Sequence, residues 1–448
     1  MKLIYDVEDK PKFGQLIVFA FQQLLAILAA TIAVPSIIGN GMSQSAALFG
    51  AGVGTIVYLL FTKFKSPVFL GSSFAFLGSM FAAFAGAVSV EAGHAGLIIG
   101  AIFAGLVYVI IALVVKFAGV AWIDKLMPPV VIGPTVAIIG LSLSGNAIGD
   151  MLKFAEFDAA NSVYAMGAKG WVGLICALAT LFVVMICSVY GKKMTKLIPF
   201  IIGILAGYAV AAIFTVIGIQ TGNDTLKIID FSLFSNMQWY PDFTFMEASK
   251  GFAAVDAKYI ATVAVAYVPV AFVVFAEHIA DHKNLSSVIG RELLEKPGLH
   301  RTLLGDGVGS IVGAVFGGCP NTTYGESVGC VAITGNASVI TILTTAIMAI
   351  VISFFGPFVT FLATIPSCVM GGVCVTLYGF IAVSGLKMIQ DVDLGDNRNL
   401  FVVSVILIAG IGGMALKIGQ VTLTEIACAL IIGIITNLIL SDKKEIKQ

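Results

Sequence analysis

The stretch CPNTTYGESVG, residues 319–329, is polar, contains a proline and a carboxylate, and lies between two long apolar runs. If those runs cross a lipid bilayer, this stretch lies at membrane depth. Non-helical backbone persists there only when it is buried in protein or lines a cavity, because each unsatisfied N–H or C=O group costs several kcal/mol. The stretch therefore predicts a break in a membrane-embedded segment, at a place where a ligand could bind.

The composition supports a membrane location. Hydrophobic residues make up 59% of the 448 residues and charged residues only 11%, and the mean hydropathy is +1.03. Runs such as LIIGAIFAGLVYVIIALVVKFAG (97–119) exceed the roughly 20 apolar residues that one helical crossing needs. They are continuous rather than alternating, which excludes an outer-membrane barrel. We expect an all-α polytopic membrane protein.

Up to fourteen apolar segments follow one another along the chain. Three of them, 68–87, 303–318 and 320–335, are too short or too rich in Gly, Ser and Thr to be regular crossing helices. The expected segments are 14–38, 45–62, 68–87, 96–119, 128–148, 170–190, 198–218, 259–280, 303–318, 320–335, 337–356, 358–384, 399–416 and 421–440.

The distribution of Lys and Arg predicts the orientation. With the N-terminus in the cytoplasm and alternating sides, 19 of the 25 cations fall in inner loops and six in outer loops. Cytoplasmic loops carry the excess of Lys and Arg, so both termini are expected in the cytoplasm. Residues 146–169 and 219–257 would then form external loops.

Charge and cysteine content exclude other classes. The net charge is zero and no long basic stripe occurs, so no nucleic-acid partner is expected. The seven cysteines are scattered without metal-ligand spacing, which indicates small buried apolar residues and no metal site. No HExxH, GxSxG or Walker A motif is present, so we expect neither an enzyme nor a cofactor.

Two pairs of related stretches suggest an internal repeat. PPVVIGPTVAIIGLSLSG (128–145) and PSCVMGGVCVTLYGFIAVSG (366–385) share their proline and glycine spacing and end in Ser-Gly. An interrupted segment precedes each copy: SPVFLGSSFAF (66–76) and GCPNTTYGESVG (318–329). Interrupted segments in corresponding halves are the best sequence indication of a transporter's site at the bilayer midplane.

The two interruptions would free backbone donors. The N–H groups of Ser73, Phe74, Tyr324 and Gly325 could bind carbonyl oxygens of a ligand, and the helices that follow would direct their positive N-terminal ends to the same place. The alternative is a pair of glycine-tolerant kinks that only allow close helix packing.

Carboxylates within apolar segments favour the binding-site interpretation. Glu326 lies in the second interruption, and Glu277 lies in VVFAEHIADH (273–282). Such groups are rare in membranes and usually line ligand or ion pathways. Asp281 is four residues after Glu277 and so on the same helix face, where two negative charges repel unless one is protonated. The alternative for Glu277 is a glutamate at the cytoplasmic interface.

Other polar residues have less specific explanations. We expect His278 to be structural because it points about 100° away from Glu277. Asp306 and Glu425 could each be a helix cap, an interhelical hydrogen-bond partner or a functional group. The remaining histidines, His94, His282 and His300, are expected in loops.

These residues resemble a known family. NTTYGExxGxxxxTG (321–335) is similar to the signature of the nucleobase:cation symporter family, also called the nucleobase–ascorbate transporters, and Glu326 resembles its uracil-permease branch. Further similar motifs are LGSSFAF (70–76), AEH (276–278), PGLHR (297–301) and PxxVMGG…LYG (366–379). The resemblance covers nearly the whole chain.

The resemblance implies a fourteen-helix fold of two inverted seven-helix repeats, with broken third and tenth helices that each carry a short strand. The repeats would be residues 1–218 and 258–448, separated by the external loop 219–257. Segments 1–4 and 8–11 would form a core domain, and segments 5–7 and 12–14 a gate domain. A homodimer through the gate domain, in the lipid of the cell membrane, is also implied.

Roles for individual residues follow from the resemblance. Glu277 and Glu326 would bind the substrate through carboxylates, Phe74 and Gly325 through backbone N–H groups, and Ser72 would lie at the break of the third helix. Phe74, Tyr324 and Tyr378 would supply aromatic surface, and Glu277, Asp281 and Glu326 together would couple transport to protons.

Two positions depart from the family pattern. Gln22-Gln23 stands where many relatives have Gln-His, and Asp281 stands where some uracil permeases have a histidine. The implied activity is uracil:proton symport by alternating access. The alternatives are a carrier of another nucleobase such as xanthine or thymine, an anion exchanger or channel, and a non-transporting receptor.

Overall fold

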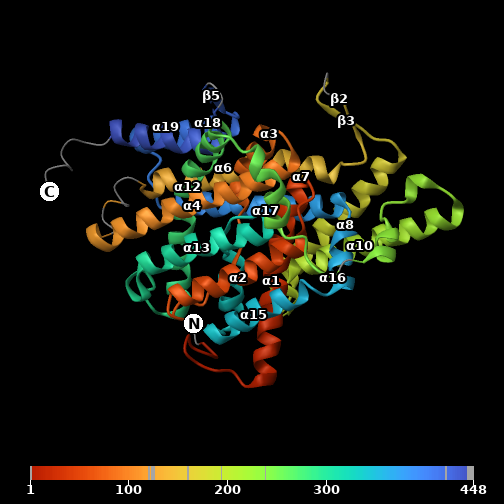
Figure 1. Cartoon of the computed structure of the whole chain (residues 1–448), viewed down its shortest axis with the longest axis horizontal. Coiled ribbons are helices and arrows are strands. Elements are labelled where there is room, and N and C mark those ends of the chain that lie inside the picture. The colour runs from red at the N-terminus through yellow and green to blue at the C-terminus, as the bar shows by residue number, and fades with distance from the viewer. Residues whose placement is uncertain are drawn as a thin grey trace.

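A computed structural model describes residues 3–119, 122, 127–158, 161–192, 194–237, 239–418 and 421–440. Figure 1 shows a helical protein whose long helices pack side by side, with short strands between some of them. Six of the lysines counted for orientation lie outside the described residues: Lys2, Lys125, Lys193, Lys443, Lys444 and Lys447.

The helices dominate the described chain. The longer ones are α1 (Phe13–Ile38), α2 (Gln44–Phe61), α4 (Val90–Ala118), α6 (Pro129–Ser142), α8 (Ala168–Tyr190), α10 (Pro199–Thr221), α12 (Ala257–Ile289), α13 (Leu299–Gly317), α15 (Val339–Ile352), α17 (Ser367–Met388), α18 (Asn397–Ile411) and α19 (Glu425–Leu440). The shorter ones are α3 (Leu77–Gly86), α7 (Ser144–Met151), α9 (Met194–Leu197), α11 (Thr244–Gly251), α14 (Gly325–Thr334) and α16 (Gly356–Ala363).

Three short antiparallel strand pairs accompany the helices in the part of the chain that the structure describes. They are β1 (Leu70–Ser72) with β4 (Asn321–Thr323), β2 (Glu156–Asp158) with β3 (Val163–Ala165), and β5 (Leu416–Ile418) with β6 (Val421–Leu423). The first pair joins segments that are about 250 residues apart in the chain, whereas the other two are local hairpins.

Many of these helices are long and apolar enough to cross a membrane. Within the described residues eight helices meet that criterion, or nine if α15 and α16, which bend by 83° at their junction, count as one span. The helix content and hydropathy are those of a polytopic membrane protein, as the composition predicts.

Some segment boundaries differ from the prediction. α6 and α7 together form one span, Pro129–Met151, close to the expected 128–148. The expected segment 358–384 instead divides into two helices, α16 and α17. Pro366 separates α16 from α17, because proline lacks an N–H group and restricts the residue before it.

The expected segment 259–280 is also too short, since α12 continues to Ile289. The prediction stopped at its charged residues, but α12 buries one face of this polar stretch, including His282. The expectation that His94, His282 and His300 lie in loops is therefore wrong: they lie in α4, α12 and α13.

Glycines allow α2 and α13 to pack closely, and this contact supports β4. A Cβ atom at Gly50 would meet the backbone carbonyl of Gly313, and one at Gly54 would meet that of Gly309. The Asn321 side chain of β4 fits beside Gly313 and donates its Nδ2 to the Gly50 carbonyl oxygen at 3.1 Å. The close helix approach therefore fixes the start of β4.

A second group of helices contains the two repeat motifs. α17 packs against α6, α7 and α8. A Cβ atom at Gly385 would meet the backbone of α6 at Gly133 and Ala137, and one at Gly140 would meet the carbonyl of Tyr378. The two proline- and glycine-spaced stretches thus face each other in space.

The N-terminal segment bonds to residues that follow the C-terminal ends of α12 and α14. Ile4 N–H donates to the carbonyl oxygen of Gly335, which follows α14, at 2.7 Å. Arg291, just after α12, lies 2.7 Å from the Asp6 carboxylate. Partial burial acts in the opposite direction, but hydrogen bonds from Val7 N–H and Arg291 hold the pKa of Asp6 below its usual value.

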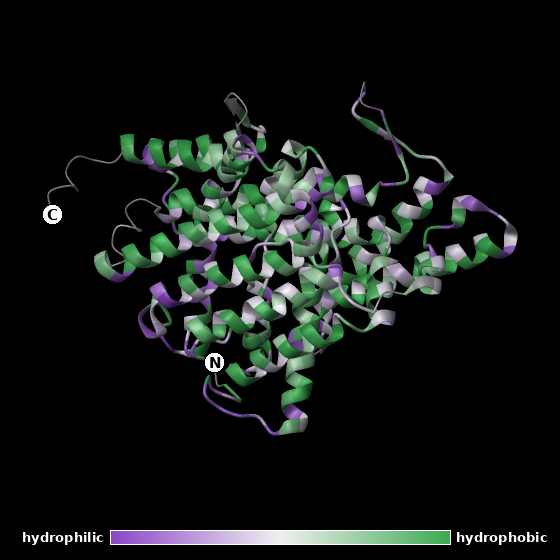
Figure 2. Ribbon diagram, in the orientation of Figure 1, coloured by the Kyte–Doolittle hydropathy of each residue, from purple (hydrophilic) through white to green (hydrophobic). Residues whose placement is uncertain are grey.

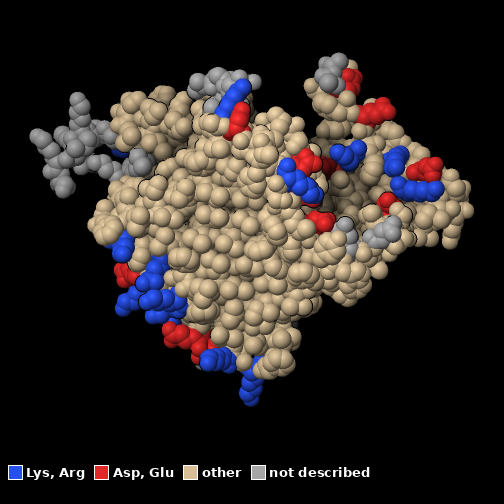
Figure 3. Space-filling model, viewed as in Figure 1, with Lys and Arg blue, Asp and Glu red and all other residues tan. Residues whose placement is uncertain are grey.

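Charge and hydropathy are distributed as in a membrane protein. The ribbons are mainly hydrophobic, and hydrophilic residues gather at helix ends and connections (Figure 2). On the face shown in Figure 3, charged side chains gather at the lower left and at the upper right, and a broad uncharged surface separates them.

Replacing Gly50 by Ala tests the close contact between α2 and α13. We expect a destabilisation of about 1–3 kcal/mol, because the added methyl group meets backbone that no side-chain rotation can move. The measurement is thermal unfolding of purified protein in detergent. Gly14→Ala in α1, where a Cβ atom has no neighbour within 4 Å, is the control. Equal melting temperatures for the two variants would contradict the expected contact.

Candidate substrate site

The site begins at the pairing of β1 with β4. Leu70, Gly71 and Ser72 pair with Thr323, Thr322 and Asn321, and all six residues are buried. Ser73 N–H donates to the Pro320 carbonyl oxygen at 2.9 Å, which extends the pairing at one end. Both interrupted stretches of the sequence therefore satisfy their extended backbone mainly by bonding to each other.

A helix begins immediately after each strand. The 3₁₀ turn η1 (Phe74–Phe76) leads into α3, and α14 begins at Gly325. The first N–H groups of a helix have no intrahelical acceptor, so Phe74 and Gly325 offer backbone donors where the two strands end. Of the four donors expected from the sequence, Ser73 and Tyr324 are wrong, because their N–H groups donate to the carbonyl oxygens of Pro320 and Phe69 in the strand pairing. Phe74 and Gly325 both line the same small cavity.

Three carboxylates line one cavity of about 350 Å³. Glu277 and Asp281, one turn apart on α12, contribute to its wall together with Glu326 in the first turn of α14. Gly325 also lines it, and a Cβ atom there would lie 3.8 Å from Asp281 Oδ1. The structure thus gathers all three candidate coupling carboxylates around one space.

A second cavity of about 40 Å³ shares wall residues with the first and is also lined by Thr322 and Thr323 of β4. Phe74 and Tyr324 line it together with Glu277, Gly325 and Glu326. An aromatic surface and carboxylates therefore face the same small space. A flat polar ring could lie against the aromatic surface while the carboxylates accept its donors.

Two predicted site residues lie behind the wall of the cavity. The Tyr378 ring packs edge-on against Phe74, with ring centroids 5.7 Å apart. The carbonyl oxygen of Ser72 accepts a hydrogen bond from the Tyr324 hydroxyl at 2.8 Å. Neither residue lines either cavity; Tyr378 contacts Phe74, and Ser72 contacts Tyr324.

The opposite end of the larger cavity reaches the protein surface. Lys196 of α9, Ile333 near the end of α14 and Met388 at the end of α17 line it there. Lys196 is exposed. The cavity therefore connects the three carboxylates with the side of the protein where α14 and α17 end.

Sequence reasoning missed several residues that hold the site together. The Thr323 hydroxyl donates to Asp281 Oδ2 at 2.7 Å. Ser327, next to Glu326, receives hydrogen bonds from Gln23 Nε2 of α1 and from Phe69 N–H, the latter at 3.0 Å. Small hydroxyl residues beside an interruption carry no specific signal in one sequence, and only the fold reveals their partners.

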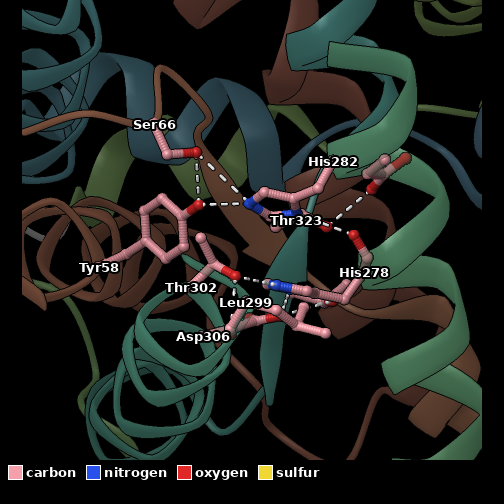
Figure 4. Close-up of polar contacts among 10 residues, drawn as sticks. Tyr58, Ser66, His278, His282, Leu299, Thr302, Asp306 and Thr323 are labelled. Atoms are coloured by element: carbon pink, nitrogen blue, oxygen red, sulfur yellow. Dashed lines mark hydrogen bonds and ion pairs between the residues drawn. The ribbon is translucent and has the colours of Figure 1, made fainter. Parts of the chain in front are cut away.

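A buried polar cluster joins α12 to α13 and α2 (Figure 4). His278 contacts Asp306 and Thr302 of α13, and His282 contacts Tyr58 of α2. The structural role expected for His278 agrees with this placement, and Asp306 is an interhelical partner, one of the alternatives for that residue. Glu425 begins α19 and lines neither cavity.

Comparison with known proteins identifies the relatives of this chain. The uracil permeases of Bacillus caldolyticus and Bacillus subtilis are 39% and 38% identical to it; each alignment covers 99% of this chain, and 96% and 97% of the respective relative. The uracil permease of Escherichia coli K12 is 34% identical over 97% of this chain and 93% of its own.

Solved structures share the fold at low sequence identity. The transmembrane domain of a cyanobacterial bicarbonate transporter matches with a TM-score of 0.65 at 17% identity, over 97% of this chain and 100% of that one. A murine solute carrier 26 anion transporter in the inward-facing state also gives 0.65, at 12% identity, over 97% of this chain and 69% of that one.

The match to a family model agrees with these relatives and with the lack of enzyme motifs. The model described as "Permease family" matches residues 14–419, which is most of the chain. The protein is thus a multi-pass membrane transporter rather than an enzyme. On its sequence, its relatives and its fold, the chain belongs to the Permease family.

Proposed function

We propose that the protein imports uracil together with protons by alternating access. The observation that carries this proposal is a pair of cavities that share Glu277, Gly325 and Glu326. Asp281 lines the larger cavity, and the aromatic residues Phe74 and Tyr324 line the smaller. The uracil permeases among its relatives support the choice of substrate.

The chemistry of uracil suits these groups. The ring is flat and carries two N–H donors and two carbonyl acceptors. The carboxylates of Glu277 and Glu326 can accept from the N–H groups, and backbone N–H groups of Gly325 and Phe74 can donate to the carbonyl oxygens. A ligand that left these buried groups unpaired would bind much more weakly, which gives selectivity.

Proton coupling is assigned to the three carboxylates together. Carboxylates this close cannot all be ionised at little cost, so a proton that enters relieves their repulsion. Asp281 takes part through its place in the cavity, where the Thr323 hydroxyl already donates to it. One proton that crosses with the membrane potential contributes about 2.3 kcal/mol per 100 mV, enough to accumulate a neutral substrate.

The proposed architecture is two inverted repeats, residues 1–218 and 258–448, joined by the external loop 219–257. The antiparallel pairing of β1 with β4 and the packing of α6 on α17 support it, because each joins corresponding parts of the two halves. We assign fourteen segments in all, with the third and tenth broken at these strands.

In this architecture segments 1–4 and 8–11 form the core, and segments 5–7 and 12–14 form the gate. The core would move against the gate, and two gates would form a homodimer in the cell membrane. The carboxylates lie on α12 and α14 of the core, and Lys196 and Met388 at the cavity mouth belong to the gate. Movement between the two domains would therefore open and close this cavity.

Both termini are assigned to the cytoplasm. The ion pair of Asp6 with Arg291 supports this assignment, because it holds the N-terminal segment beside a loop that the Lys and Arg distribution places inside. In this orientation the cavity mouth at Lys196 faces the cytoplasm.

Two alternatives remain as outcomes of the tests. Another nucleobase, such as xanthine or thymine, would use the same groups, and competition by a ligand panel separates these substrates. The structural neighbours include transporters of anions, but three carboxylates around the cavity disfavour an anionic substrate.

Uptake of radiolabelled uracil into proteoliposomes tests the function directly. We expect accumulation driven by an inward proton gradient and blocked by excess unlabelled uracil. Uptake that depends on a sodium gradient and not on pH would support uracil as the substrate but contradict proton coupling. An anion-driven current without uracil uptake would contradict the proposal and favour the exchanger.

Glu326→Gln should weaken uracil binding by roughly thirtyfold or more, and Glu277→Ala should do the same. Each removes a charged acceptor whose hydrogen bond contributes about 2 kcal/mol or more, which is a loss of roughly thirtyfold in affinity. Isothermal titration of detergent-purified protein gives the affinities. Glu425→Gln, a glutamate outside the cavity, is the matched control, and unaltered affinity in Glu326→Gln would refute the site.

Asp281→Asn tests the coupling role separately. The amide keeps an acceptor for the Thr323 hydroxyl but cannot take up a proton, so binding should change by less than about fivefold, roughly 1 kcal/mol. Uracil uptake should lose its dependence on the proton gradient, whereas Asp150→Asn should keep it. If Asp281→Asn preserves both transport and pH dependence, Asp281 is a bystander.

A further inference from the structure

Helix α12 carries two polar stripes. Glu277 and Asp281, four residues apart, line the cavity. His278 and His282, also four residues apart, form the neighbouring stripe, and both side chains are fully buried without lining the cavity. The proposed transport mechanism uses the carboxylates and leaves the histidines unexplained.

Both ring nitrogens of His278 bind α13 (Figure 4). Nδ1 lies 2.7 Å from Asp306 Oδ2, and Nε2 lies 2.9 Å from Thr302 Oγ1. Thr302 Oγ1 is also 3.0 Å from the carbonyl oxygen of Leu299, which can only accept. The one hydroxyl proton of Thr302 therefore goes to Leu299, and Nε2 of His278 must donate to Thr302.

The hydrogen-bond pattern also fixes the protons of the His278–Asp306 pair. With a proton on Nε2, the 2.7 Å contact between Nδ1 and Oδ2 holds one further proton. An imidazolium with a carboxylate and an imidazole with a carboxylic acid contain the same number of protons. Either form has zero net charge, which allows the pair to be fully buried.

His282 belongs to the same cluster. Its Nδ1 donates to the backbone carbonyl oxygen of His278 at 2.8 Å, and its Nε2 lies 2.7 Å from the Tyr58 hydroxyl oxygen. The Tyr58 hydroxyl donates to Ser66 Oγ at 2.7 Å. The two imidazole rings stack with centroids 4.1 Å apart, where a second positive charge would be repelled.

The pair adjoins the strand that precedes Glu326. Asp306 Oδ2 lies 3.5 Å from the Thr322 hydroxyl, and the next residue, Thr323, donates to Asp281 at 2.7 Å. Strand β4 therefore touches a carboxylate of α13 with one threonine and a carboxylate of α12 with the next. The distance between α12 and α13 determines whether both contacts can form.

We propose that His278 is a positioning residue: through its proton-sharing contact with Asp306 it fixes α13 against α12, and thereby holds β4 and Glu326 at the substrate site. This inference rests on the proposed function of that site. Because the pair is already neutral, it does not serve as the group that exchanges the transported proton.

The groups around the pair agree with this role. α12 contributes Glu277, Asp281 and His282, and α4 contributes Tyr108, whose ring centroid is 6.4 Å from that of His278. α2 contributes Tyr58 through His282. No Lys or Arg contacts the pair within the described part of the chain. The charges of His278 and Asp306 are therefore balanced by each other.

The test measures uracil uptake in proteoliposomes for three variants. His278→Asn can still donate to Asp306 from the position of Nδ1, whereas His278→Gln and His278→Ala cannot. We expect the half-saturating uracil concentration to rise at least about tenfold in His278→Ala and His278→Gln, as for other residues that orient a ligand-binding group. His278→Asn should stay within about threefold, and all variants should keep the pH profile of the parent protein.

His94→Asn is the matched control, because His94 is a buried histidine that binds a backbone carbonyl, that of Asn40, away from the site. It should lower thermal stability without changing half-saturation. The double variant His278→Ala/Asp306→Ala should be no worse than the more impaired single variant, since the two residues act as one unit.

Three results would overturn the proposal: unchanged half-saturation in His278→Ala, equal effects of His278→Asn and His278→Gln, or a shifted pH profile, which would make His278 a coupling residue. If a variant does not reconstitute, uracil-dependent thermal stabilisation in detergent gives the same comparison. Absence of uracil uptake by the parent protein would instead refute the proposed substrate. The half-saturating concentrations of the variants and the parent are then compared with the nucleobase that the protein carries.

Discussion

The pairing of β1 with β4 is the constraint on which the rest of the structure depends. Extended backbone inside a membrane protein must find hydrogen-bond partners, and the two interrupted stretches find them in each other. The helices that follow then begin at a common place, and Phe74, Gly325 and Glu326 line one cavity there. Close packing of α2 on α13 also supports the strand pair, because Asn321 of β4 donates to the Gly50 carbonyl oxygen of α2.

The buried charges divide into two kinds. Glu277, Asp281 and Glu326 share a cavity that reaches the surface, so their protonation can respond to substrate and solution. His278 and Asp306 are fully buried and lie 2.7 Å apart, Nδ1 to Oδ2, so their charge is balanced within the pair. The proposed mechanism needs both kinds, because the groups proposed to change charge must be held by groups that do not.

The fold alone does not determine the substrate. Solved transporters of bicarbonate and of other anions share this fold at 17% identity or less. In this chain the cavity carries three carboxylates and a backbone donor where strand β4 ends, and this suits a neutral ring with N–H donors better than an anion. The uracil permeases, at 34–39% identity, agree with that difference.

Much of this protein could be predicted from its sequence, because hydropathy and proline or glycine spacing act over short stretches. The membrane-spanning class, the two interruptions and the choice of Glu277 and Glu326 as candidate site residues follow from the cost of polar groups in hydrocarbon. The division of 358–384 at Pro366 and the extension of α12 to Ile289 did not follow from hydropathy. Only the tertiary structure decided that Thr323 meets Asp281, that Gln23 meets Ser327 and that His278 meets Asp306. Those partners lie on different elements, up to about 300 residues apart, and a hydrogen bond between distant residues leaves no periodic signal in one sequence.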